Sequence, residues 1–357
     1  MSVPKFDEKE LGVVRELPLR TGGTIPVYGT PVPLGEGYLA LQARQPIWQV
    51  TNCETLSFTP SINKDNIARA FVFEGQAYPR EKYGGPDMFG LEWVFVEVTG
   101  GSIVRPGSPL LASTNEWKDK IQFPDVEKWD WAASKALNVD YLKDDRTLLM
   151  TFLNGYFERL IAFMDFDKAA VALIDEDQQD AVKAFFQALS DLYIKIFDKF
   201  IDTYNVKVIN LHDDWGTQIN PFFSPDTCEE MIVPYMRQVT DHLRSRGVVP
   251  ELHCCGKVER QVPNMIKAGF NSWGGMYMND YDALYDAYGD KFIFGVLAPE
   301  VPATASLEEQ RDAARAFVKR YCSDPKRPVL YNNYRAANLT PAYREELYKQ
   351  SRIAFGG

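Results

Sequence analysis

The chain has 357 residues, of which 45% are hydrophobic and 25% are charged, as in an ordinary globular protein. Its formal net charge of −10 argues against nucleic acid or an anionic membrane as the main partner, because both bind basic surfaces. Residues 1–11 hold no apolar signal segment, and no run of about 18 uncharged apolar residues occurs. We therefore expect a cytoplasmic protein that neither crosses nor binds a membrane.

The predicted elements alternate between strands and helices along most of the chain. Residues 1–45 are rich in Gly and Pro and are expected to form an N-terminal arm or cap. Apolar and β-branched runs predict strands at 46–51, 88–93, 146–152, 206–211, 248–253, 271–274, 292–297 and 328–332. Amphipathic stretches predict helices at 177–203, 225–246, 258–268, 280–288 and 306–321.

This order predicts an α/β fold, specifically a (β/α)8 TIM barrel over residues 46–357 with an N-terminal extension. Valines around Gly100 and Gly101 interrupt the rhythm and predict an inserted β-hairpin at about 94–111. A doubly wound open sheet is the alternative architecture. In a barrel, catalytic side chains stand at the carboxyl ends of the strands.

One of only three histidines stands at such a strand end, in the run Leu252-His253-Cys254-Cys255-Gly256. Alternation along a strand points His253 and Cys255 to the same side. A nitrogen and a sulfur donor aimed at one point suit zinc. The alternative is a buried cysteine beside a hydrogen-bonded histidine.

A second polar cluster, His212-Asp213-Asp214, follows the apolar run 206–209. One of its carboxylates is expected to complete a zinc shell or to orient His253. Asp214 is preferred because the turn that follows it at Trp215 directs it inward. A loop with helix-capping carboxylates is the alternative.

Other polar and aromatic residues near strand ends are candidates for substrate binding or catalysis. Asn333 follows the last predicted strand, where its amide can bind a ligand. An aromatic-lined pocket is one interpretation of the rest, and core packing or loop hydrogen bonding is the other. The candidates for substrate binding are Trp215, Gln218, Phe223, Tyr277 and Tyr331.

The five cysteines form no regular disulfide framework, so free thiols are expected. Cys322 ends a predicted helix, where packing is its simplest role. The chain lacks a P-loop, a dinucleotide-binding glycine pattern and a Gly-x-Ser-x-Gly motif. It also lacks an Asp-x-His-x-x-Gly corrinoid loop, so any corrinoid must be carried by another protein.

The chain resembles the uroporphyrinogen decarboxylase superfamily, and within it the branch of zinc- and corrinoid-dependent methyltransferases. The resemblance runs from about residue 46 to residue 339 and is strongest over 210–273. The residues that carry it are Asp87-Met88-Phe89-Gly90, Asp213 to Gln218, Phe223-Ser224-Pro225, Pro234, His253 to Gly256 and Ala268 to Asn271.

The resemblance implies a zinc ion held by a His-x-Cys pair and by a distant cysteine near the last strand. His253 and Cys255 match the pair, whereas Cys322, the candidate for the distant ligand, precedes the last strand. An oxygen ligand such as Asp214 is therefore expected to complete the shell. Asp87 resembles the pyrrole-binding aspartate of the decarboxylases, but the segment 47–53 lacks their arginines.

The function implied is a zinc-dependent methyltransferase, in which Asp214, Asp87 and Asn333 are the candidate catalytic residues. It would move a methyl group between a small substrate, preferably an O-methylated aromatic, and a separate corrinoid protein. A tetrapyrrole decarboxylase and a non-catalytic ligand-binding barrel are the alternatives. The identity of the methyl donor or acceptor, the direction of transfer and the oligomeric state stay open.

Overall fold

The computed structural model describes residues 4–18, 24–51, 53–98, 101–105, 107, 109–299, 301–302, 304–332 and 340–356. The chain divides into two compact units. One unit comprises Met1–Leu56, Asp145–Thr147 and Ser272–Gly357, and the other comprises Ser57–Asp144 and Leu148–Asn271. Among the described helices, none is long and apolar enough to cross a membrane.

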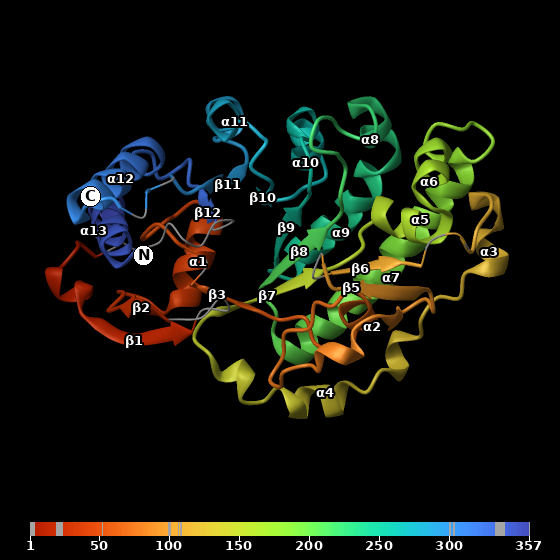
Figure 1. The fold of residues 1–357 in the computed structure, drawn as a ribbon, viewed down its shortest axis with the longest axis horizontal. Coiled ribbons are helices and arrows are strands. Elements are labelled where there is room, and N and C mark those ends of the chain that lie inside the picture. The colour runs from red at the N-terminus through yellow and green to blue at the C-terminus, as the bar shows by residue number, and fades with distance from the viewer. Residues whose placement is uncertain are drawn as a thin grey trace. The chain divides into compact units, whose positions relative to one another are not determined.

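The second unit contains three parallel strands, β7 (Thr147–Phe152), β8 (Val208–His212) and β9 (Val249–His253). All three were predicted from their apolar and β-branched residues, which suit a buried pleated surface. Figure 1 shows them as neighbouring arrows. Because parallel strands end at the same edge, the segments that follow them carry their side chains to a common place.

Helices follow each of these strands. After β7 come α5 (Phe157–Met164), α6 (Phe166–Ala172) and α7 (Gln179–Tyr204). After β8 come α8 (Pro225–Met231) and α9 (Val233–Ser245), and after β9 comes α10 (Val262–Lys267). The prediction of one helix over 225–246 was wrong, because Pro234 in the first turn of α9 has no N–H to continue the helix before it.

The same unit holds a three-stranded antiparallel sheet of β4 (Gly85–Pro86), β5 (Glu92–Val96) and β6 (Gly101–Val104). The predicted parallel strand at 88–93 was wrong. The chain turns at Gly90, whose φ is +84°, and only then enters β5. Among the described residues, the unit also contains the helices α2 (Lys64–Ala68), α3 (Trp117–Lys120) and α4 (Trp131–Leu137).

The first unit has its own parallel strands, β10 (Ser272–Gly274), β11 (Ile293–Leu297) and β12 (Leu330–Asn332). They alternate with α11 (Tyr281–Tyr288), α12 (Leu307–Tyr321) and α13 (Pro341–Gly356). The unit also contains an antiparallel pair, β1 (Val13–Pro18) and β2 (Thr24–Tyr28), and the helix α1 (Leu34–Gln42). The short strand β3 (Thr55–Ser57) lies at the unit boundary.

The predicted first strand at 46–51 was wrong, since these residues, all of them described, form a loop. The loop closes around the buried carboxylate of Glu54. That carboxylate accepts the Trp48 indole N–H at 3.0 Å and the Thr51 backbone N–H at 2.9 Å. A backbone N–H that donates to a side chain in this way cannot also donate to a neighbouring strand, so it does not support a β-sheet.

The N-terminal segment packs on the C-terminal helix within the first unit. The short 3-10 helix Glu8–Leu11 places Glu10 against Arg352 of α13, with Nε 2.8 Å from Oε2. The Tyr348 hydroxyl donates to the same carboxylate at 2.7 Å. This segment is therefore held by part-buried polar contacts.

From β7 onward strands and helices alternate along the chain as predicted, and the α/β class is confirmed. Closure into an eight-stranded barrel stays a prediction. So do the boundary between residues 1–45 and 46–357 and the status of the β5–β6 hairpin as an insertion.

A buried ion cluster fixes helix α5 within the second unit. The Arg159 guanidinium forms ion pairs with Asp65 and with Asp87, the latter at 2.9 Å, and all three side chains are fully buried. Asp87 also accepts the Trp93 indole N–H at 3.1 Å and the backbone N–H groups of Phe89 and Leu91. Both oxygens of Asp87 are thus used inside the protein.

Replacing Arg159 with methionine should strongly destabilise the protein, because two carboxylates would stay buried without their cation. We expect a loss of about 3–5 kcal/mol in the free energy of unfolding. Urea unfolding followed by tryptophan fluorescence measures this loss. The control is Arg80→Met, which removes the exposed pair with Glu97 and should cost less than about 1 kcal/mol. Equal losses in the two variants would contradict the structural role of the cluster.

Candidate metal centre

Four side chains at the ends of β8 and β9 converge on one point. His212 and Asp214 come from β8 and the residues after it, and His253 and Cys255 come from β9 and the residues after it. Each offers a ligand atom, and among the described residues these four atoms lie within 4.8 Å of one another. Two features of the strands produce this convergence. Residues two apart point to one side of a strand, and the register sets His212 directly opposite His253.

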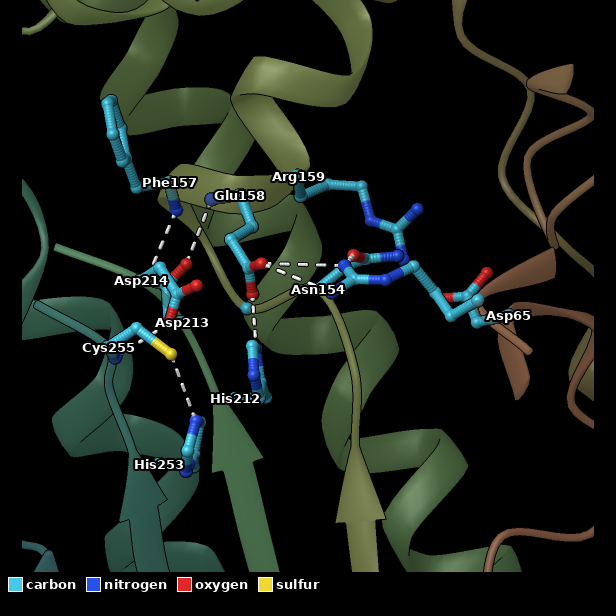
Figure 2. A network of polar contacts seen from close by, with 12 residues as sticks. Asp65, Asn154, Phe157, Glu158, Arg159, His212, Asp213, Asp214, His253 and Cys255 are labelled. Atoms are coloured by element: carbon cyan, nitrogen blue, oxygen red, sulfur yellow. Dashed lines mark hydrogen bonds and ion pairs between the residues drawn. The ribbon is translucent and has the colours of Figure 1, made fainter. Parts of the chain in front are cut away.

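The four side chains also contact one another directly (Figure 2). The His253 Nε2 atom lies 3.2 Å from the Cys255 Sγ atom, and the Cys255 backbone N–H donates to Asp214 Oδ1 at 2.7 Å. The imidazole rings of His212 and His253 stack with centroids 4.5 Å apart and an angle of 19° between their planes. The donors are two imidazoles, a thiol and a carboxylate, a set that fits zinc or a similar borderline metal.

The loops that carry these ligands pack backbone against backbone. Gly256 has a φ of +96°, and a Cβ atom there would lie 2.4 Å from the backbone of Gly216. The Lys257 backbone N–H donates to the Thr217 carbonyl at 2.7 Å. Any larger residue at position 256 would push the two ligand-bearing loops apart.

Asp213 points to the opposite side from its neighbours and binds the start of α5. Its carboxylate accepts the backbone N–H groups of Phe157 at 3.2 Å and Glu158 at 2.9 Å. It also accepts the indole N–H of Trp215 at 2.9 Å. The two adjacent aspartates thus have different roles: Asp214 belongs to the group of four candidate ligands, called the metal group below, and Asp213 anchors helix α5 beside it.

The sequence analysis did not assign Glu158 to this site, and it did not assign His212 as a metal ligand. Its Oε2 atom lies 2.7 Å from His212 Nδ1, and its Oε1 atom lies 3.4 Å from Arg69 Nη1. Arg69 is itself bonded to the Asn154 side chain. Asn154 and Glu158 both follow β7, so the strand-end criterion that selected His212 would have selected them too.

The charges and the burial of the site shift the pKa values of its two histidines in opposite directions. Burial alone would raise the pKa of Glu158, but the charges of His212 and Arg69 lower it to about 2. The pKa of His212 is raised, because the attraction of Glu158 outweighs the effect of burial. Burial and the neighbouring His212 lower the pKa of His253 to about 3. His253 is therefore neutral, which is the form that binds a metal.

Burial and neighbouring negative charge raise the pKa values of the two aspartates and of the cysteine thiol. Burial and the charge of Glu158 raise the pKa of Asp213 to about 7 and also raise that of Asp214. Burial and Asp214 raise the pKa of the Cys255 thiol. A divalent cation placed among these groups would favour their ionised forms.

Three predicted substrate residues lie in the same unit as the metal group. Trp215 is fully buried, and its indole holds Asp213, so its contacts are structural. Phe223 is half-buried and packs edge-on against Phe157, with ring centroids 5.1 Å apart. Gln218 lies exposed in the loop after β8.

The other predicted residues have contacts unrelated to the four ligands. Cys322 ends α12, and its thiol is 3.5 Å from Gln49 Oε1, within the first unit. Tyr331 is buried in β12 and packs on Phe317, whereas Tyr277 is 55% exposed after β10. Asn333 lies outside the described residues. Asp87 is held by Arg159, so its catalytic role stays a prediction.

A comparison with models of known protein families assigns the chain to one of them. The model of the uroporphyrinogen decarboxylase (URO-D) family matches residues 85–330, well over half of the sequence. The chain belongs to this family, which is named for an enzyme. Among curated proteins, no match was found.

Solved structures give a likeness of fold. A methyltransferase from Methanosarcina mazei superposes with a TM-score of 0.51 at 13% identity, over 91% of this chain and 99% of that one. A group IV chitinase from Ostrinia furnacalis scores 0.28 at 11% identity, over 49% and 52%. A sugar phosphate isomerase/epimerase from Parabacteroides distasonis scores 0.30 at 11% identity, over 64% and 80%. The first likeness supports the α/β fold, and the other two scores are too low to carry weight.

Metal binding by the group of four can be tested on the purified protein. We expect about one zinc ion per chain in the native protein and a marked loss in His253→Ala and Cys255→Ala, because each change removes a ligand. Elemental analysis after dialysis measures the zinc content. The remaining histidine supplies the control: His242 of α9 is bonded to Asp198 of α7, and His242→Ala should keep the metal. Undiminished zinc in His253→Ala would contradict this assignment.

Proposed function

We propose that the protein is a zinc-dependent methyltransferase that moves a methyl group between a small substrate and a corrinoid carried by another protein. The observation that carries the proposal is the group of His212, Asp214, His253 and Cys255 at the ends of two parallel strands. A parallel α/β enzyme places its reactive groups at this edge. Membership of the URO-D family and the fold of the Methanosarcina mazei methyltransferase are consistent with this function.

The four side chains would hold the zinc ion. Bound zinc would supply Lewis acidity to the heteroatom that carries the methyl group. The methyl carbon would exchange its bond to oxygen for a bond to a reduced cobalt centre. The oxygen keeps the pair of electrons from the broken bond, and cobalt supplies the pair for the new one.

An O-methylated aromatic is the preferred substrate. Half-buried phenylalanines follow β8 in the chain segment between the ligand Asp214 and helix α8. Phe222 packs against Phe166 with ring centroids 4.8 Å apart, and Phe223 packs against Phe157. Such rings favour a flat apolar ligand over a small thiol. The leaving oxygen would then be a phenoxide.

Decarboxylation of a tetrapyrrole is the second candidate, and the family match favours it. The burial of Asp87 argues against it. The carboxylate that resembles the pyrrole-binding group accepts hydrogen bonds from Trp93 and from two backbone N–H groups, and it pairs with Arg159. A carboxylate with both oxygens used in this way has little capacity left for a substrate.

Two anaerobic assays on the zinc-loaded protein separate these candidates. The first mixes the protein with 2-methoxyphenol and chemically reduced cobalamin. We expect conversion of the Co(I) spectrum to that of methylcobalamin, release of catechol, and loss of both in Cys255→Ala, because the variant loses a zinc ligand. The second supplies uroporphyrinogen. A less carboxylated porphyrinogen, with no methylcobalamin in the first assay, would replace the proposal by the decarboxylase.

A further inference from the structure

We infer that Glu158 is a positioning residue that fixes His212 as a metal ligand through its Nε2 atom. The inference rests on the metal site of the proposed function and adds to it a role for a residue outside the group of four. It follows from which nitrogen of His212 is already used and from what holds Glu158 in place.

The Glu158 carboxylate occupies one nitrogen of His212. Its Oε2 atom is 2.7 Å from Nδ1, a short distance typical of a charge-assisted hydrogen bond. The carboxylate accepts, so the proton stands on Nδ1. The nitrogen left to bind a metal is Nε2. Metal-binding histidines commonly donate their other N–H to a carboxylate, which fixes the tautomer and strengthens the ligand.

Two contacts besides the one with His212 hold Glu158 in place. Its backbone N–H donates to Asp213 Oδ1 at 2.9 Å, which fixes the first turn of α5. Its Oε1 atom faces Arg69, which is bonded to Asn154. The side chain is 12% exposed, so solvent competes little for the carboxylate. Figure 2 shows Glu158 between His212 and Asn154, which follows β7.

The orientation of His212 also affects its neighbour. Its ring stacks on that of His253 at 4.5 Å with 19° between the planes. Rotation of the His212 ring would break this stack. Glu158 therefore constrains two of the four ligands, although it contributes no ligand atom.

The role is tested in protein labelled with ¹⁵N-histidine, in which only three imidazoles give signals. In zinc-loaded native protein, His212 should carry its proton on Nδ1 and bind zinc through Nε2. Glu158→Ala should lose this tautomer and lower the affinity for zinc by about 10–100-fold. Glu158→Gln keeps an acceptor for the Nδ1–H without the charge, so its affinity should lie between the two.

The control is Glu230→Ala, which removes a surface carboxylate paired with Lys183 and should change neither measurement. Native affinity and an unchanged His212 tautomer in Glu158→Ala would overturn the inference and leave the metal site intact. Absence of zinc binding in the native protein would instead overturn the metal site, and this inference with it. If Glu158→Ala does not fold, Glu158→Gln decides by the same two measurements.

Discussion

The register between β8 and β9 is the constraint on which the candidate metal centre of His212, Asp214, His253 and Cys255 depends. His212 pairs with His253 across the ladder, so the residues two positions further on, Asp214 and Cys255, also stand at one level. A shift of one residue would turn either pair to the other side of the sheet. The buried residues of both strands resist that shift, because it would move side chains that pack on one face of the sheet to the other face. The packing of the two strands thereby sets the spacing of the four side chains.

Helix α5 connects this register to the rest of the unit. Its first turn donates two backbone N–H groups to Asp213, and successive side chains then diverge. Glu158 faces His212, whereas Arg159 enters the buried pair of Asp65 and Asp87. The cost of burying three charges is thus offset in a cluster that also fixes the helix. A rigid helix start is what a positioning carboxylate requires, because a ligand displaced by a fraction of an ångström binds less well.

Sequence reasoning reached part of this arrangement. The strand-end criterion found His253, Cys255 and Asp214, because alternation and the carboxyl-end rule depend only on local pattern. It did not make His212 a ligand, since the register between two strands is a long-range property. Glu158 was missed because it stands in a helix, where a glutamate is ordinary. The false strands at 46–51 and 88–93 are apolar runs whose backbone is instead organised by the buried carboxylates of Glu54 and Asp87.

The types of donor atom in the group of four bear on the direction of the proposed methyl transfer. Thiolates donate more charge to zinc than imidazoles or carboxylates do, and a thiolate-rich site suits activation of a bound thiol. Here one thiol stands with two imidazoles and a carboxylate, so a metal held by them would remain more electrophilic. The carboxylate of Glu158 interacts with both His212 and Arg69. Because Arg69 partly neutralises its charge, Glu158 reduces the electrophilicity of such a metal only partly. An electrophilic metal favours weakening the bond between a methyl group and oxygen over delivering a methyl group to sulfur. Under the proposed function, this donor set therefore favours demethylation of an ether over methylation of a thiol.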